Sequence, residues 1–231
     1  MNILEIPCNP ANYGGYRGKN VKYLVIHYTA APGDTAKNNG EYFAREKTGT
    51  SAHYFVDENT VVRSVAEEYA AWHCGAAVYR HPDCRNQNSI GIEICTKGGP
   101  GDYRFAPEAV ELAKQLTKQL MERYNIGPDD VLRHYDVTGK VCPAPFVGQG
   151  DGAWETFKGG LMVYKTVNDV PQWGQKTIQK LLSRGILEGD GENLNLSYDL
   201  VRTLVILDRA EVWKENNNGN TIEQIGSDLS E

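Results

Sequence analysis

An apolar run, Tyr-Leu-Val-Ile at residues 23–26, leads directly into a histidine, His27. Such a run within residues 21–26 predicts a strand in the middle of a β-sheet. A side chain at the end of this strand is held by a rigid element, which suits a metal ligand. The run therefore predicts a central sheet and, at the end of one strand, a place where chemistry can be positioned.

Further strand and helix patterns alternate along the first two thirds of the chain. Period-two patterns predict a β-hairpin at residues 52–65, with its turn at residues 57–59, and a strand at residues 89–95. Helices are expected at residues 35–46, at residues 107–124 and from residues 154–158 onward. Strands that alternate with helices predict an α/β fold, a mixed central β-sheet flanked by helices.

Two of these elements carry more detail. In the strand at residues 89–95, three isoleucines share one face, so Glu93 points away from the aliphatic core. The alternative for Glu93 is an ordinary carboxylate at the edge of a strand. The helix at residues 107–124 has Pro107 in its first turn and an apolar stripe along one side, and we expect the Gly-Pro pair at residues 127–128 to end it.

The character of the chain changes after about residue 165. Helix patterns at residues 171–184 and 200–213 flank a turn region at residues 185–191. These patterns predict a small C-terminal helical domain. The predicted organisation is an α/β domain at residues 1–165, a helical domain at residues 166–214 and a polar, unstructured tail at residues 215–231.

Composition and charge argue against several classes of protein. The chain has 231 residues and a formal net charge of −6, whereas a nucleic-acid binder usually carries a basic stripe. No run approaches the ~18 apolar residues of a membrane helix, and the first residues lack the pattern of a secretory signal. We therefore expect a protein made in a reducing cytosol, with no nucleic-acid or membrane partner.

The cysteine count is odd. In a reducing cytoplasm Cys142 can remain available as a thiolate for a metal. Cys8, Cys74, Cys84 and Cys95 are expected to be free thiols without an assigned role. Cys74 and Cys84 are close enough in sequence to pair in an oxidising medium, although nothing requires it.

Residues 134–142 contain an imidazole, a cation and a thiol in His134, Lys140 and Cys142. Together with His27 they supply two imidazoles and one sulfur, which are three ligands of the kind that zinc prefers. Three protein ligands leave the fourth tetrahedral position open, and an open position distinguishes a catalytic zinc from a structural one. Taken singly, His27 would be a hydrogen-bonded histidine, Cys142 a buried thiol and Lys140 a solvated charge.

Five segments together resemble one enzyme family. They are residues 25–29, 51–54, 71–75, 88–93 and 133–143. In this order they are similar to zinc-dependent N-acetylmuramoyl-L-alanine amidases of the type found in phage endolysins and peptidoglycan recognition proteins. The resemblance covers residues 23–158.

The resemblance implies roles for five residues. His27, His134 and Cys142 would bind Zn²⁺, and Lys140 would lie near the scissile carbonyl. Glu93 matches the acidic residue that acts on the attacking water in related endolysins. Some relatives use a tyrosine directly before the histidine of residues 51–54. In this chain that position is Ala52, so the resemblance favours Glu93 as the base.

Other residues are candidates for contact with the substrate. Trp72 and His73 together suit a sugar or a peptide, and His53 is a further polar group for the same groove. The alternative for both histidines is a structural role.

The C-terminal segment at residues 170–203 resembles a single S-layer-homology-like unit, a kind of module that binds secondary cell-wall polymers. Arg202 is the residue in that unit that we expect to bind the wall. The alternative is a helical hairpin that packs on the catalytic domain or forms a homodimer.

The expected activity is hydrolysis of the amide bond between N-acetylmuramic acid and L-alanine in bacterial peptidoglycan. The absence of a signal peptide suits a phage or prophage endolysin that is made in the host cytoplasm and acts on the wall after release. Two alternatives stay open: a peptidoglycan-binding module without catalysis, and a domain with a purely structural zinc. The first is disfavoured by Cys142, and the second would need a fourth protein ligand.

Overall fold

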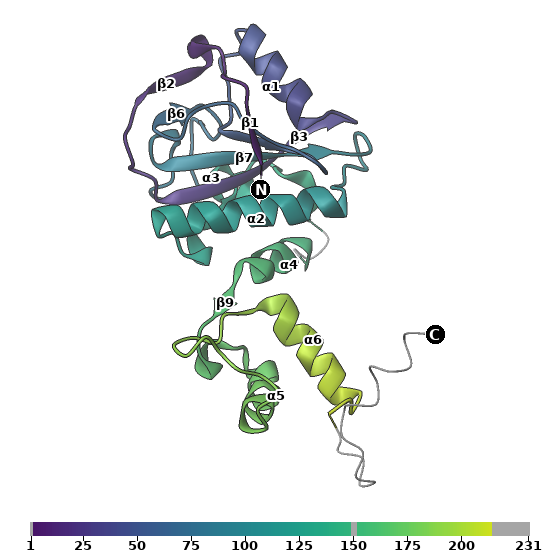
Figure 1. The fold of residues 1–231 in the computed structure, drawn as a ribbon. Coiled ribbons are helices and arrows are strands. Elements are labelled where there is room, and N and C mark those ends of the chain that lie inside the picture. Colours follow the sequence, from purple (N-terminus) through teal and green to yellow (C-terminus); the bar gives the residue numbers. More distant parts are fainter. Residues whose placement is uncertain (1, 149–151, 214–231) are drawn as a thin grey trace. The chain divides into compact units, whose positions relative to one another are not determined.

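The computed structural model describes residues 2–148 and 152–213 (Figure 1). The tail predicted at residues 215–231 lies outside the described residues. The chain divides into two compact units, Met1–Met162 and Val163–Glu231. Within the described ranges, no helix has both the length and the apolar character that crossing a membrane requires.

The first unit is built on a mixed β-sheet, as predicted. Its strands are β1 (Ile3–Glu5), β3 (Tyr23–Pro32), β4 (Tyr54–Val56), β5 (Val61–Arg63), β7 (Ser89–Thr96) and β8 (Val131–Arg133). Among the described residues their order across the sheet is β1-β5-β4-β7-β3-β8. The hairpin of β4 and β5 is antiparallel, and the other neighbours are parallel. This pairing confirms the fold class and the predicted hairpin.

Strand β3 lies between β7 and β8 near one edge of the sheet, and it is longer than expected. The apolar run ends at Ile26, but the strand continues through His27 to Pro32. The reason is pairing with β7, whose register places His27 beside Glu93 and Tyr28 beside Ile94. His27 therefore lies within a strand rather than at its end.

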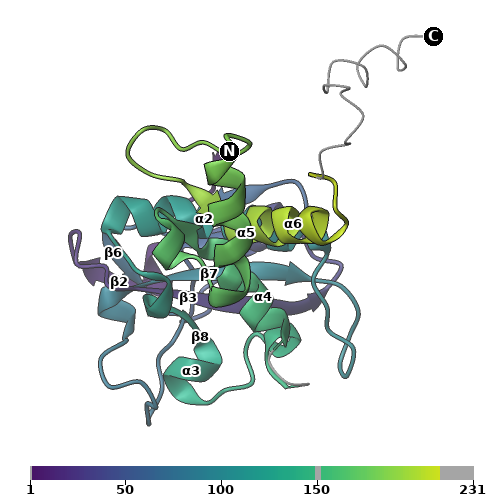
Figure 2. The ribbon, with the colours of Figure 1, turned by 90° about the horizontal axis from the view of Figure 1, so that it is seen from below.

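Helices cover both faces of this sheet (Figures 1 and 2). Leu24, Ile26 and the isoleucines of β7 pack with α2 (Pro107–Tyr124) and α4 (Gly152–Leu161) in the main core. The opposite face packs with α1 (Ala36–Arg45) and α3 (His134–Thr138). Because side chains alternate along a strand, His27 and Glu93 lie on this second face.

Helix α2 spans the predicted residues. Of the predicted stripe, Ala113, Leu116 and Leu120 are buried, and Val110 and Met121 pack against the core partly buried. Its end differs: Asn125 adopts a left-handed conformation with φ of 53° and caps the helix before the Gly-Pro pair is reached. Asparagine tolerates this conformation because its short polar side chain can bond locally.

A second antiparallel pair, β2 (Tyr13–Tyr16) with β6 (Tyr69–Ala71), was not expected from the sequence. Short 3-10 turns occur at Pro10–Asn12, Asn86–Asn88, Pro128–Asp130, Ala144–Phe146 and Val167–Asp169.

The second unit has the two expected helices with shifted bounds, α5 (Gln172–Ser183) and α6 (Tyr198–Arg209). Helix α6 begins earlier than predicted because the Ser197 hydroxyl accepts the backbone N–H of Leu200 and caps it. The unit also contains a small antiparallel pair, β9 (Val163–Tyr164) with β10 (Leu196–Ser197), that the helical prediction missed. Its core includes Ile178, Leu181, Val201 and Val205.

Candidate metal centre and groove

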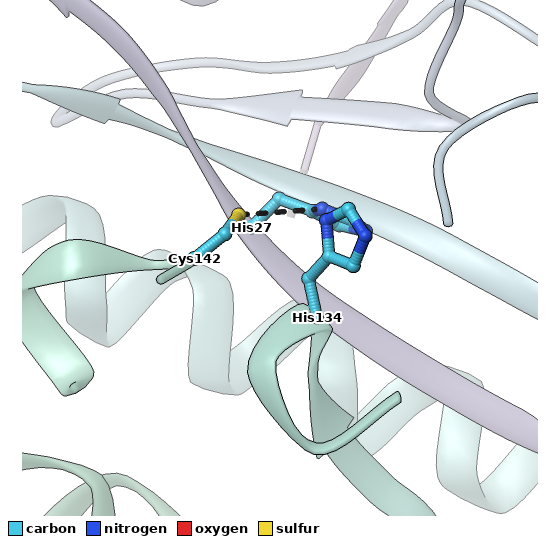
Figure 3. A group of neighbouring side chains, drawn as sticks. All are labelled: His27, His134 and Cys142. Carbon is cyan, nitrogen blue, oxygen red and sulfur yellow. Dashed lines mark hydrogen bonds between the residues drawn. The ribbon is translucent and has the colours of Figure 1, made fainter. Parts of the chain in front are cut away.

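Three side chains from separate parts of the chain meet on one face of the sheet (Figure 3). His27 comes from β3, His134 is the first residue of α3, and Cys142 lies in the loop after α3. One ligand atom from each of the three lies within 4.8 Å of the other two. The structure therefore brings together the three predicted ligands as a His-His-Cys group that could hold a metal.

Strand pairing explains why two of these residues meet. Strands β3 and β8 are parallel neighbours, and Ile26 pairs with Arg133, so the residues that follow them emerge side by side. Arg133 is held by an ion pair with Asp136 and donates to the carbonyl of Phe146 at 2.7 Å. The backbone carbonyl of Cys142 accepts the N–H of Tyr135 at 2.8 Å, and this hydrogen bond holds Cys142 close to α3 and the site.

Burial keeps both imidazoles neutral. Desolvation, with nearby positive charge, lowers the pKa of His27 well below its ordinary value. Burial first, and then the charge of Lys140, lowers the pKa of His134 to about 4. Neutral imidazoles are the form that binds a metal. The Nδ1 atom of His134 is buried and has no hydrogen-bond partner in the described part of the chain.

The surroundings of Cys142 also suit a metal ligand. Burial raises the pKa of its thiol to about 12, so it becomes a thiolate only when a positive charge lies against it. Its Sγ atom lies 3.6 Å from Nδ1 of His27. Two neutral imidazoles, one of them with an orphaned nitrogen, and a thiol form a donor set that fits a soft-to-borderline cation such as zinc.

Glu93 lies beside this group. Its Oε1 atom is 3.9 Å from Nδ1 of His27, and its Oε2 atom is buried without a partner among the described residues. Burial raises the pKa of this carboxyl to about 8, although the charge of Lys140 acts in the opposite direction. A carboxyl that titrates near neutral pH is suited to general acid–base chemistry.

A groove of about 480 Å³ opens beside the centre. Its lining includes His134, so the groove reaches the candidate metal centre, and it also includes three of the predicted residues, Trp72, His73 and Lys140. Trp72 is 37% exposed. The remaining lining residues are Gly49, Thr50, Gly75, Ala76, Asn86 and Thr138.

His53 does not line this groove, which corrects the expectation that it contacts substrate. Its side chain is 0% exposed. Its Nδ1 accepts the N–H of Gly91 at 3.0 Å, and its Nε2 lies 3.1 Å from both the carbonyl of Tyr69 and the guanidinium of Arg17. Both ring nitrogens lie within hydrogen-bond distance of backbone groups, so His53 has a structural role.

Sequence reasoning missed Asn86 and Ser89. The amide oxygen of Asn86 accepts the backbone N–H groups of His73 and Cys74, at 3.2 and 2.9 Å, and so shapes one wall of the groove. Ser89 accepts a hydrogen bond from the His73 ring, or donates one to it, at 3.1 Å. Their position in the sequence could have pointed to them, because both residues lie close to the start of the segment at residues 88–93.

The remaining predicted residues lie elsewhere. All five cysteines are free and buried, and Cys74 and Cys84 pack in one small apolar cluster. In the second unit, Arg202 is exposed on α6, one turn after Tyr198. The ring of Tyr198 meets that of Trp173 edge-on, with centroids 5.8 Å apart.

Comparisons with known proteins agree on one family. The family model described as N-acetylmuramoyl-L-alanine amidase matches residues 17–145. The N-acetylmuramoyl-L-alanine amidase CwlL of Bacillus licheniformis is 33% identical over 189 residues, which cover 74% of this chain and 51% of CwlL. The chain thus spans about half the length of this curated relative.

Solved structures give the same result. The catalytic domain of XlyA superposes with a TM-score of 0.58 at 30% identity, covering 70% of this chain and all of that domain. A mutant endolysin from Bacillus subtilis gives a TM-score of 0.58 at 30% identity, covering 70% of this chain and 99% of that structure. The sheet, the His-His-Cys group and these matches lead to one assignment: the chain belongs to the N-acetylmuramoyl-L-alanine amidase family.

Proposed function

We propose that this protein is a zinc-dependent hydrolase that cleaves the amide bond between N-acetylmuramic acid and L-alanine in bacterial peptidoglycan. The observation that carries the proposal is the convergence of His27, His134 and Cys142 within 4.8 Å, beside the unpartnered carboxyl of Glu93. Membership of the amidase family supports the same reaction.

In this proposal the three converging residues hold Zn²⁺. When bound, zinc supplies a Lewis acid for the scissile carbonyl and acidifies the attacking water. The burial of all three side chains excludes competing solvent and keeps the imidazoles neutral. The groove beside them leaves one side of the centre accessible to a substrate.

Glu93 accepts the proton of the attacking water and passes it to the leaving amine of L-alanine. Its place on β7, directly across from His27, holds the carboxyl at the centre. A pKa raised by burial matches this double role, because the group must first gain and then release a proton near neutral pH.

Lys140 stabilises the oxyanion of the tetrahedral intermediate. It is exposed and lines the groove, and its charge helps to lower the pKa of His134 and limits the rise in the pKa of Glu93. Trp72 and His73 provide the groove with an aromatic and a polar surface for the glycan or the stem peptide.

The second unit is proposed to bind a secondary cell-wall polymer through Arg202 and the neighbouring pair Tyr198 and Trp173. The enzyme then acts as an endolysin on the wall after its release from the host cytoplasm, and a second binding site raises its local concentration there. Replacing Arg202 by Ala should weaken pelleting with walls but leave cleavage of soluble muropeptides unchanged. Equal pelleting by both proteins would argue against wall binding at Arg202.

The activity is tested on purified cell walls. The zinc-loaded protein should release stem peptides with new L-alanine amino termini, detected by mass spectrometry, and a chelator should stop the release until zinc is restored. Cys142→Ser should abolish turnover and lower zinc content, whereas Cys8→Ser, at a buried cysteine in another cluster, should do neither. Wall binding without new amino termini would instead identify a non-catalytic binding module.

A further inference from the structure

A chain of hydrogen bonds leads from a backbone carbonyl to one of the three candidate ligands. The Ser89 hydroxyl donates to the carbonyl of Arg85 at 2.7 Å. The same hydroxyl lies 3.1 Å from Nε2 of His73, and Nδ1 of His73 lies 3.0 Å from Nε2 of His27. These contacts join residues on a loop, on β7 and on β3.

The direction of every bond in this chain follows from its fixed end. A carbonyl can only accept, so the single hydroxyl hydrogen of Ser89 goes to Arg85, which is nearer than the Cys74 sulfur at 3.7 Å. The Ser89 oxygen must then accept from Nε2–H of His73. In a neutral ring this leaves Nδ1 of His73 without a proton, so it accepts from Nε2–H of His27.

The hydrogen bond from His27 to His73 determines which ring nitrogen of His27 has a free lone pair. With its proton on Nε2, His27 has a lone pair on Nδ1, the atom that lies 3.6 Å from the Cys142 sulfur. The opposite direction would place a proton on Nδ1 and block it as a ligand. It would also require the Ser89 hydroxyl hydrogen to point at His73 at 3.1 Å and not at the nearer Arg85 carbonyl at 2.7 Å, which would then keep only the N–H of Asn88 at 3.1 Å.

We propose that His73 is a positioning residue that holds His27 in the tautomer with a free Nδ1, and that Ser89 sets the direction of this relay from the backbone of Arg85. The inference rests on the proposed metal centre, in which Nδ1 of His27 binds zinc. Partners of this kind orient metal-binding histidines and raise their basicity.

The surroundings of His73 favour a fixed ring over a mobile one. Its ring lies directly on the backbone of β7, where a Cβ atom added at Gly91 would come within 2.5 Å of its Cγ. Its backbone N–H is held by Asn86 at 3.2 Å. The rings of His27 and His73 meet edge-on, at 88°. A glycine on β7 thus leaves the space in which the ring fits.

Nitrogen NMR of the metal-free full chain tests the relay without any activity. Spectra of ¹⁵N-labelled histidine should show His27 and His73 both protonated on Nε2. Ser89→Ala should shift His73, and with it His27, away from this tautomer, whereas Ser64→Ala removes a buried hydroxyl that contacts neither ring. A wild-type His27 protonated on Nδ1 would overturn the proposal.

Zinc affinity, measured by competition with a chelator, gives an independent result. His73→Phe keeps a ring on Gly91 but removes both nitrogens, and should weaken zinc binding about 10–100-fold. His73→Asn places an amide oxygen where Nδ1 stands and should restore most of the affinity. Affinity equal to wild type in His73→Phe would defeat the relay.

The two proposals can fail separately. If wild type takes up no zinc, the proposed function fails, and the NMR result still decides the relay. If His73 serves only to contact substrate, its variants will raise KM while the tautomer of His27 and the zinc affinity stay unchanged, which contradicts the inference.

Discussion

Each residue of the proposed reaction centre owes its chemical properties to its immediate surroundings. Glu93 would be an unremarkable carboxylate on a solvated strand, but burial beside His27 raises its pKa to about 8. Cys142 would be an inert buried thiol, but its sulfur faces two neutral imidazoles. The same low-polarity environment thus raises the pKa of the carboxyl and keeps the imidazoles neutral, as the proposed proton transfer and metal binding require.

Replacing Glu93 by Gln should separate catalysis from metal binding. The amide keeps the size of the side chain but cannot carry a proton between water and the leaving amine, so kcat should fall about 10²–10⁴-fold. Zinc content should remain that of wild type. Glu68→Gln, at an exposed carboxylate, is the matched control for turnover. Full activity of the Glu93 variant on walls would remove Glu93 from the mechanism.

Among the secondary-structure elements, α2 contributes several buried side chains to the main core on its face of the sheet. Leu116 and Leu120 are each 1% exposed and pack among the isoleucines of β7. Near its end, Arg123 and Tyr124 both donate to Glu67, which also receives a hydrogen bond from Tyr54 on β4. Glu67 therefore links the helix to the sheet through a buried carboxylate.

Truncating the helix core should destabilise the first unit. Leu116→Ala should lower the free energy of unfolding by about 2–5 kcal/mol, because it leaves a cavity between α2 and the sheet. Gln119→Ala, on the exposed side of the same helix, should change it by less than about 0.5 kcal/mol. Denaturant unfolding followed by circular dichroism measures both. Equal effects would contradict the assignment of the buried face.

The Glu67 network should make stability depend on pH in acid. Burial alone would raise the pKa of Glu67, but hydrogen bonds from Tyr124, Tyr54 and Arg123 outweigh it and lower the pKa. A depressed folded-state pKa contributes stability that is present above the unfolded-state pKa, about 4.3, and is lost as pH falls through the folded-state value.

Glu67→Gln should therefore destabilise the protein by about 1–3 kcal/mol at pH 7 and flatten the acid limb of its stability curve. Denaturant midpoints measured from pH 7 down to the acid transition would show this. If the variant loses stability at low pH in the same way as wild type, Glu67 is not a source of that pH dependence.

At the scale of the whole molecule, the chain consists of two units, each with a core of its own. The candidate metal centre, Glu93 and the groove all belong to the first unit. The second unit is held by the packing of α5 on α6 and by the short pair of β9 and β10. Catalysis and any wall binding through the second unit should therefore respond to different mutations.

Ile178→Ala should test this independence. The side chain is fully buried in the second unit, so its truncation should lower the stability of that unit by about 2–5 kcal/mol. Hydrogen exchange should report faster opening of α5 and α6, while cleavage of a soluble muropeptide stays at the wild-type rate. Gln179→Ala, at the next and exposed position, serves as control. A matching loss of turnover would show that the units do not act separately.

Much of the fold could be predicted because side-chain periodicity is a local property. Alternation along residues 89–95 placed the isoleucines on one face and Glu93 on the other, and the structure confirms both. The apolar stripe of α2 could be predicted from periodicity in the same way. The residue types at positions 27, 134 and 142 also indicated a metal group, because few side chains combine as ligands in that way.

What only the tertiary structure decided depends on pairing between distant segments. Strand β3 continues past its apolar run because β7 pairs with it, and His53 turns inward because the backbone of Gly91 binds its ring. His73 reaches His27 across 46 positions of sequence and Ser89 across 16. Periodicity determines which way a side chain faces; which groups then meet is decided by strand register and loop path, since hydrogen bonds act only at contact distance.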